Sequence, residues 1–366
     1  MNDEPIVITS MARTPMGGFQ GELKSLSGTD LGTAALKAAL QRSSLGGSDV
    51  SEVMMGNVLP AGLGQAPARQ AALGAGLDLS TPCTTISKVC GSGMKATMLG
   101  HDMISVGSAD IIAAAGMESM TNAPYLVPKM RNGARLGHAE MLDHMFFDGL
   151  EDAYDKGRLM GTFAESCADH YSFTREQQDE YALASLDRAL KAIEKGHFRN
   201  EITPVDTGRG MVDVDEQPGK ARPDKIPSLK PAFRKDGTVT AANSSSISDG
   251  GAALVLMRRS EAEKRGFDPT GYHCRPLQPC QGARVVYHRA GRSHSATHGQ
   301  DRMERIGCGS VRDQRGVFGR ASRRDEGAGY SPRQGECTRW RLRIGASPGR
   351  FRGTDYCDLA GGDADL

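Results

Sequence analysis

The sequence predicts an α/β fold in which short apolar strands alternate with amphipathic helices. Three observations support this over about the first 268 of the 366 residues. β-rich runs recur and end at turn residues, several of them are followed by apolar residues at helical spacing, and one run is apolar along its whole length. A strand of that last kind is buried on both faces of its sheet, so helices are expected on both sides.

The first elements follow one another closely. The run IVITSMART ends at Arg13-Thr14-Pro15 and is typical of a strand that leads into a loop. Residues 30–42 have apolar side chains at helical spacing, with Asp30 as the expected N-cap. A strand and turn are predicted over 50–60, followed by a helix over 65–77 that ends at a Gly.

The next part contains the most informative turn. Residues 84–104, TTISKVCGSGMKATMLGHDMI, predict a short strand, a glycine-rich turn and a helix. Residues 110–119, DIIAAAGMES, form the fully apolar strand.

From about 120 to 240 the sequence predicts an α-rich insertion over the sheet. Its main helix starts at Thr174, has Glu176 and Gln177 in its first turn, and ends at Gly196. A loop and a buried strand follow over 237–258.

Overall composition excludes several classes of protein. The 45 basic and 44 acidic residues leave a net charge of +1, which argues against a nucleic-acid binder. Eight irregularly spaced Cys indicate a reducing compartment. There is no apolar run of about 18 residues and no secretory pattern, so we expect a cytoplasmic protein with no membrane partner.

The composition changes abruptly near residue 268. The last Lys is Lys264, whereas 18 of the 32 Arg and five of the eight Cys lie from Arg265 onward. Leu becomes rare there, and neither helical nor strand periodicity is sustained. We therefore expect residues 269–366 to be a disordered tail without a recognisable fold. The Arg-rich tail lacks the interleaved aromatics of a nucleic-acid site, and it lacks a CxxC zinc pair.

Cys90 is the best candidate nucleophile. It lies at the predicted strand-to-helix junction, next to Gly91, where the backbone can turn tightly and a substrate can approach. A helix N-terminus stabilises a thiolate, and its N–H groups could stabilise an oxyanion during acyl transfer. A buried structural cysteine is the alternative, and it is the interpretation we favour for Cys83 and Cys167.

Other polar residues carry weaker signals. His138 and His144 lack the i, i+4 spacing of a helical metal pair, so we expect loop histidines and no metal site. The run Asn243–Ser246 is either polar loop filler or a ligand-contacting loop. No phosphate-binding Gly-Lys-Ser loop or dinucleotide fingerprint is present.

Several ordered blocks now carry a family resemblance. They include ARTPMGGFQGEL, GNVLPAGLGQAPARQAAL, ISKVCGSGMKA, AGMESMTNAPY, DGLEDAYDKGRLMGTFAE and LKPAFRKDGTVTAANSSSISDGGAALVLM. Residues 5 to about 268 resemble the N-terminal half of a thiolase, close to acetyl-CoA acetyltransferases. The resemblance implies a layered αβαβα fold, with residues 1–268 as its N-terminal domain and about 120–240 as the insertion that binds coenzyme A.

The resemblance also implies the chemistry and the site. Cys90 is implied to be the acyl-carrying nucleophile. CoA contacts map to Leu150, Ala241 and Ser245, with Lys220 or Arg222 near the phosphates. The substrates are implied to be acyl-CoA and CoA, with no permanently bound cofactor, and the intact fold is implied to be a homo-oligomer, either a dimer or a tetramer. The expected reaction is reversible formation of acetoacetyl-CoA and CoA from two acetyl-CoA, and the place in metabolism is fatty-acid metabolism. The alternatives are a degradative 3-ketoacyl-CoA thiolase and a catalytically dead remnant.

The tail departs from the family pattern. A thiolase continues with a NEAF block, a GHP block and a second reactive Cys, and none of these occurs in residues 271–366. Reading the permitted codons one nucleotide forward turns DQRGVFGR, from Asp313, into INEAFSVV. The same shift turns RQGECTRWRLRIGAS, from Arg333, into DKVNVHGGACALGH, where the single codon of Trp340 forces a Gly. We therefore interpret the tail as out-of-frame from about residues 269–271, with the family's acid/base groups lost.

Overall fold

A mixed sheet is the centre of the structure. The computed structural model describes residues 4–267 and 273–274. The strand order is β11-β1-β10-β5-β3-β4, and β2 also pairs with β10. The strands are β1 (Ile6–Arg13), β2 (Gly17–Gly18), β3 (Glu52–Gly56), β4 (Cys83–Ile86), β5 (Ile111–Ser119), β10 (Ser248–Arg258) and β11 (His273–Cys274). β3 runs parallel to both β4 and β5, whereas β10 runs antiparallel to both β1 and β5.

The two central strands are the most deeply buried. Every residue of β5 is buried, as predicted for the apolar run 110–119, and all of β10 except Arg258 is buried as well. The two strands pair over nine residues, from Asp249 opposite Ser119 to Met257 opposite Ile111. The carboxyl end of β5 therefore lies beside the amino end of β10, at one edge of the sheet.

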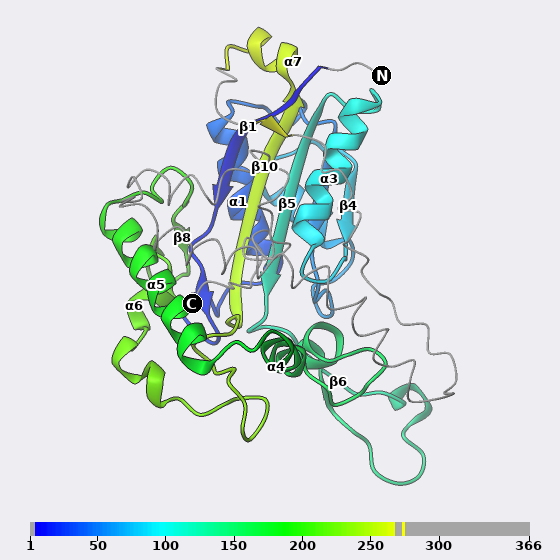
Figure 1. Cartoon of the computed structure of the whole chain (residues 1–366). Coiled ribbons are helices and arrows are strands. Elements are labelled where there is room, and N and C mark those ends of the chain that lie inside the picture. Colours follow the sequence, from blue (N-terminus) through cyan, green and yellow to red (C-terminus); the bar gives the residue numbers. More distant parts are fainter. Residues whose placement is uncertain (1–3, 268–272, 275–366) are drawn as a thin grey trace, which may run out of the picture.

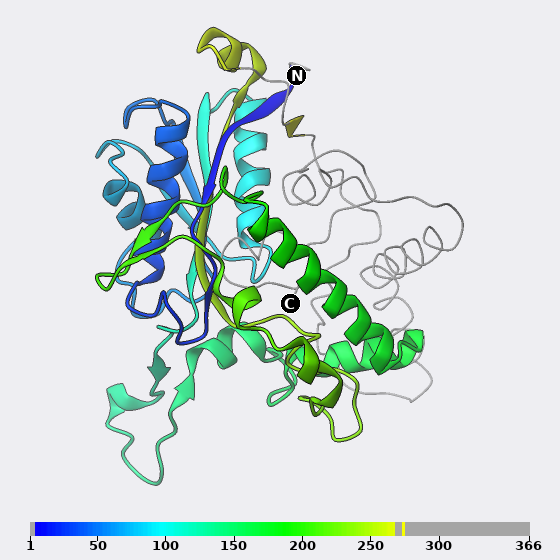
Figure 2. The ribbon, with the colours of Figure 1, turned by 90° about the vertical axis from the view of Figure 1, so that its left-hand side faces the viewer.

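Helices cover both faces of this sheet. α1 (Gly28–Arg42) and α2 (Pro67–Gly74) pack on one face with a core that includes Leu36 and Ala71. α3 (Ser92–Ser105) packs on the other face through Ala96 and Ile104. Figure 2 shows α1 and α3 on opposite sides of the sheet. The described residues thus form an α/β/α sandwich, which confirms the predicted fold class.

Two helix starts test the expected capping residues. The structure places Ser27, not Asp30, at the N-cap of α1, and Asp30 is the third helical residue of a capping box. The Ser27 amide donates to Asp30 Oδ2 over 2.9 Å, and the Asp30 amide donates to Ser27 Oγ over 3.2 Å. The expected start at Thr174 is confirmed, with Gln177 completing its capping box.

A long helical segment separates β5 from β10. Figure 1 shows α4 and the region around β6 beyond the edge where β5 ends. The elements are β6 (Tyr125–Leu126), η1 (Met130–Asn132), β7 (Leu142–Asp143), η2 (Met145–Leu150), α4 (Met160–Tyr171), α5 (Arg175–Glu194), β8 (Val205–Asp206), β9 (Met211–Val212), α6 (Glu216–Lys220) and η3 (Pro223–Ser228). The last described helix, α7 (Arg259–Lys264), follows β10.

One buried ion cluster ties this segment to the sheet. Arg13, at the end of β1, donates from Nε to Glu201 Oε1 over 2.8 Å. Its Nη1 and Nη2 donate to the two carboxylate oxygens of Asp215 over 2.6 and 2.9 Å. All three side chains are buried. Burial alone would lower the pKa of Arg13, but Asp215 and Glu201 together raise it, so the guanidinium stays charged.

Some expectations concern residues that are not described. The disorder and the shifted frame expected of 269–366 lie outside the described residues, apart from His273 and Cys274, which pair with β1. The division into 1–268 and 269–366 therefore stays a prediction. Within the described residues, no helix is long and apolar enough to cross a membrane.

Candidate active site

Cys90 lies in the turn between β4 and α3, at the edge of the sheet where β3, β4 and β5 end. Gly91 is the N-cap of α3, and the Cys90 side chain is exposed. The Ser92 hydroxyl closes the turn, because it accepts from the Lys88 amide over 2.8 Å and donates to the Val89 carbonyl over 2.6 Å. Val89 has a φ of 47°, a conformation that costs a β-branched residue energy. The turn therefore presents the thiol at the positive end of α3.

The N–H groups near Cys90 are partly engaged within this turn. The Gly91 amide donates to the Lys88 carbonyl and the Ser92 amide to the Val89 carbonyl, both over 3.1 Å. The sequence suggested that N–H groups here could stabilise an oxyanion. Since these two already have acceptors in the turn, the expectation is narrowed to the other donors around the thiol.

The end of β3 forms the wall behind the turn. A Cβ added to Gly56 would lie 2.7 Å from the Gly93 nitrogen and 2.7 Å from the Ser92 carbonyl carbon, so only glycine fits without a shift of the backbone. The next residue, Asn57, donates its backbone N–H to the Ile86 carbonyl at the end of β4 over 3.0 Å. The segment after β3 is thus packed directly against the two ends of the Cys90 turn.

Glu118 is a buried carboxyl at this edge that the sequence did not single out. It accepts from Asn57 Nδ2 over 2.8 Å, from the Val58 amide over 2.7 Å and from the Leu59 amide over 3.1 Å. Burial raises the pKa of Glu118 to about 8, and the charges of Cys90 and Asp249 add to the rise, although the Val58 and Leu59 N–H groups oppose it. A charged residue at the end of the apolar run 111–117 was the available signal.

Leu150 is the last residue of η2 and is half-buried. His144 precedes η2, and its Nδ1 lies 2.8 Å from Asp148 Oδ2. The Ala61 amide donates to His144 Nε2 over 3.4 Å. His144 was expected to be a loop histidine, but it is buried. Its contacts with Asp148 and Ala61 join η2 to the loop after β3. His138 is exposed.

Ala241 and Ser245 are exposed residues of the loop between η3 and β10. Asn243 organises this loop, because its Oδ1 accepts from the Thr240 amide over 2.7 Å while its Nδ2 donates to Asp179 Oδ1 over 3.0 Å. The run Asn243–Ser246 is therefore not mere filler, since Asn243 gives the loop a defined shape.

Lys220 ends α6, beside the same loop. Gln217 of α6 donates from Nε2 to Ser248 Oγ over 3.0 Å and accepts from Ser246 Oγ over 2.9 Å. The Lys220 ammonium is ion-paired with buried Glu216, which raises the pKa of Lys220. Gln217, a residue that carried no sequence signal, thus links α6, which ends at Lys220, to Ser246, the neighbour of Ser245. Leu150 lies on a different element, η2.

Comparison with known proteins identifies the family. The family described as "Thiolase, N-terminal domain" matches residues 6–260. The chain belongs to the thiolase family. The sequence-based assignment to this enzyme family is therefore confirmed.

Similar proteins agree with this. The thiolase is 49% identical to "Acetyl-CoA acetyltransferase" of Schizosaccharomyces pombe over 275 residues, which cover 74% of this chain and 69% of that protein. It is 50% identical to "Acetyl-CoA acetyltransferase 2" of Arabidopsis thaliana over 275 residues, or 73% and 68% of the two chains. The crystal structure of Acat5 thiolase from Ascaris suum in complex with coenzyme A matches with a TM-score of 0.69 and 41% identity, covering 73% of this chain and 69% of that one.

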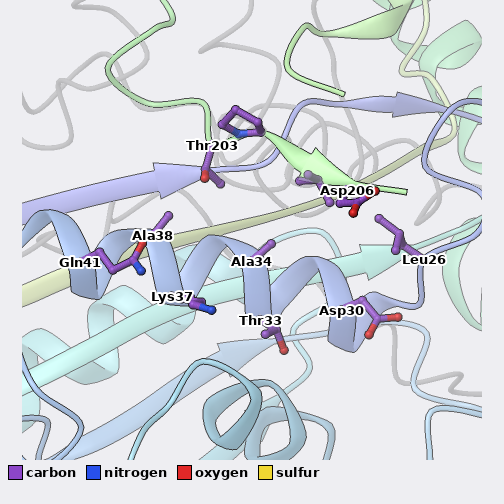
Figure 3. A pocket seen from close by; sticks show the side chains of 11 residues that line it. Leu26, Asp30, Thr33, Ala34, Lys37, Ala38, Gln41, Thr203 and Asp206 are labelled. Atoms are coloured by element: carbon purple, nitrogen blue, oxygen red, sulfur yellow. The ribbon is translucent and has the colours of Figure 1, made fainter. Parts of the chain in front are cut away.

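A separate hollow of about 380 Å³ lies between α1 and residues 203–206 of the thiolase. Figure 3 shows its lining, which includes Leu26, Asp30, Lys37, Gln41, Thr203 and Asp206. The hollow lies on the face of the sheet that α1 covers, opposite to α3, and none of the predicted site residues lines it. Among the described residues, no group of three His, Cys, Asp or Glu is placed to hold a metal ion.

Proposed function

We propose that this thiolase transfers acyl groups through a thioester on Cys90, as an acetyl-CoA C-acetyltransferase that reversibly joins two acetyl-CoA into acetoacetyl-CoA and CoA. The observation that carries the proposal is the exposed Cys90 thiol at the N-terminus of α3. The names of the relatives support the choice of acetyl groups. A covalent intermediate divides one difficult exchange into two easier steps.

The first half-reaction is acyl transfer to the enzyme. The Cys90 thiolate attacks the carbonyl carbon of acetyl-CoA, a carbon–sulfur bond forms to Cys90, and the bond to the CoA sulfur breaks. CoA leaves as a thiolate and takes up the proton that Cys90 released. In the second half-reaction, the deprotonated α-carbon of another acetyl-CoA attacks the Cys90 thioester carbonyl, a carbon–carbon bond forms, and the bond to the Cys90 sulfur breaks. Cys90 leaves as a thiolate and takes up a proton, which balances the one removed from the α-carbon. The proton acceptor for that carbon is assigned, by resemblance, to the part of the family fold that follows residue 271.

Coenzyme A is proposed to lie between Leu150 and the loop that carries Ala241 and Ser245. The Ascaris suum relative, which was solved with coenzyme A, supports this class of ligand. Lys220 is proposed to lie near the phosphates. Its ion pair with Glu216 makes it a weaker partner than exposed Arg222, which has no ion pair with any of the described residues.

Trapping the acyl-enzyme tests the proposal. Wild-type protein incubated with radiolabelled acetyl-CoA is expected to retain label in its Cys90 peptide after acid quenching. Cys90→Ser removes the label, whereas the matched change Cys83→Ser leaves it in place. Label that persists in Cys90→Ser, or that is lost in Cys83→Ser instead, would overturn the assignment of the nucleophile.

We further propose that the chain with its present tail does not complete the cycle. The observation is that residues 271–366 contain neither the NEAF nor the GHP block. Because catalytic groups act as a unit, their loss removes nearly all turnover. The expected result is poor solubility and CoA binding without acetoacetyl-CoA cleavage. Measurable cleavage that is abolished by Cys90→Ser would contradict this.

Three further expectations remain proposals. Repairing the frame near residues 269–271 is expected to restore turnover, and chain-length kinetics on the repaired enzyme would distinguish a degradative 3-ketoacyl-CoA thiolase. The repaired enzyme is expected to be a dimer or tetramer by sedimentation. Its expected compartment is the cytoplasm, which fractionation of cells would test.

A further inference from the structure

We propose that Glu118 is a positioning residue for the Cys90 thiol, because its buried carboxyl holds the turn after β3 against the N-terminus of α3. The inference rests on the proposed function, in which Cys90 is the nucleophile.

Glu118 anchors the turn through three donors that are consecutive in sequence. Asn57 Nδ2, the Val58 amide and the Leu59 amide all donate to its two oxygens, over 2.7 to 3.1 Å. The side chain belongs to a residue only 4% exposed, so these donors replace the water that a carboxyl group requires. One side chain on β5 therefore fixes the backbone of the whole turn after β3.

The end of β3 and the turn after it contact both sides of the Cys90 turn. Asn57 is bonded on one side to Glu118 and on the other to the Ile86 carbonyl, four residues before Cys90. Gly56 lies so close to Ser92 and Gly93 that a Cβ would overlap them. Because both ends of the Cys90 turn touch the segment that Glu118 holds, a change at Glu118 moves the surroundings of the thiol.

The hydrogen-bonding groups at this edge include more acceptors than donors. Asn57 Oδ1 and Asp249 Oδ2 are buried and have no hydrogen-bond partner in the described part of the chain. An ionised Glu118 would add another acceptor, whereas a protonated one contributes a donor. The proton on Glu118 thus removes a buried charge.

The charged groups that act on Glu118 are Cys90, on the turn before α3, and Asp249, at the start of β10. The Cys90 thiolate raises the pKa of Glu118, and by reciprocity an ionised Glu118 disfavours the thiolate. Near neutral pH the carboxyl keeps its proton, which leaves the thiolate without a like charge beside it. As Glu118 ionises around its pKa of about 8, a like charge appears beside the thiol.

The test is the pH dependence of Cys90 alkylation by iodoacetamide, measured peptide by peptide with mass spectrometry on the full chain. Alkylation reports the thiolate and needs no turnover. Cys83 and Cys167 serve as internal references, since burial raises the pKa of each of these thiols. The variant is Glu118→Gln. The matched control is Glu52→Gln, at the opposite end of β3, where the carboxylate accepts from Thr84 Oγ1.

In wild type, the rate of Cys90 alkylation is expected to rise with pH in two steps. The reason is that two interacting groups share their proton losses, so neither the thiol nor the carboxyl titrates alone. Glu118→Gln is expected to show one step and a rate about two- to threefold faster than wild type near the midpoint of the wild-type profile. Glu52→Gln is expected to follow wild type. A Glu118→Gln profile that superimposes on wild type overturns the proposal.

If Glu118→Gln does not fold, a second measurement tests the proposal without that variant. The infrared C=O band of a protonated carboxyl is followed through a pH titration of wild type and of Cys90→Ser. The band is expected to titrate at lower pH in Cys90→Ser, and an unchanged titration overturns the coupling. If no acetyl group is trapped on Cys90 while the two-step alkylation profile persists, the proposed function fails and the coupling stands.

Discussion

Changing Glu165 to Gln tests how the loop that carries Ala241 and Ser245 is held in place. Glu165 is on α4 and only 2% exposed. Its carboxylate accepts from the Thr238 amide over 2.9 Å and from the Val239 amide over 2.9 Å. Gln keeps one acceptor oxygen but replaces the other with an NH₂ group, which turns an N–H···O contact into a contact between two donors.

The size of the effect follows from the bonds that are lost. A hydrogen bond to a charged group contributes about 1.5–3 kcal/mol, and the variant loses at least one such bond. Because about 1.4 kcal/mol corresponds to a tenfold change, the loop is expected to open about 10- to 150-fold more often. Hydrogen exchange of the Thr238 and Val239 amides, followed by NMR or by mass spectrometry of short peptides, measures this opening directly.

Asp169→Asn is the matched control, because Asp169 lies one turn along α4 and is exposed, where it pairs with Arg234. Exposed ion pairs contribute little, so this variant is expected to change exchange of the same amides by less than about threefold. If Glu165→Gln also stays within about threefold of wild type, the loop is held by something other than the carboxylate, and the reasoning from its hydrogen bonds is refuted.

Three further predictions concern the sheet and the Cys90 edge. Arg13→Met removes the guanidinium that balances the buried carboxylates of Glu201 and Asp215, so urea titration is expected to show a loss of about 3–5 kcal/mol, and a loss below about 1 kcal/mol would contradict it. Gly56→Ala inserts a methyl group 2.7 Å from the backbone of α3 and is expected to cost about 1–3 kcal/mol, whereas Gly219→Ala, which meets nothing within 4 Å, should cost far less in the same titration. Because the pKa of Glu118 is raised from 4.5 to about 8, the folded state retains a proton that the unfolded state releases, and stability is expected to fall as pH rises through this window. Urea titrations at several pH values should show that Glu118→Gln flattens this slope, and an unchanged slope would show that Glu118 does not carry it.

The elements that could be predicted are those whose signals are local. The start of α5 was found because Thr174 and Gln177 form a capping box within four residues. The start of α1 was misplaced for a related reason, since Ser27 and Asp30 are both suitable caps and only the backbone geometry shows that Ser27 has that role. For the helices that were predicted, the ambiguity was thus limited to a few residues at the ends, whereas α4 was not predicted as a separate helix.

The residues of the candidate site were found or missed for the same reason, according to whether their signal is local in sequence. Cys90 was recognisable because the glycine-rich turn that exposes it surrounds it in sequence. Glu118 and Glu165 were missed because their partners are distant, with Glu118 separated from Asn57 by 61 residues and Glu165 from Val239 by 74. A single buried carboxylate looks the same in sequence whether it holds a loop or faces water, so only the tertiary structure could identify its partners.

The order of strands in the sheet has a consequence for synthesis on the ribosome. β10 lies between β1 and β5, and β1 pairs in the described structure only with β10 and β11. A nascent chain therefore carries β1 without a neighbouring strand until residues 248–258 have emerged, after the whole helical segment has been made. Contacts of such long sequence separation form slowly. The change of reading frame that we propose at 269–271 would come just after this strand, when the ribosome has already translated what the sheet needs to join β1 to β5. The same change thirty codons earlier would have left β1 with no strand between it and β5.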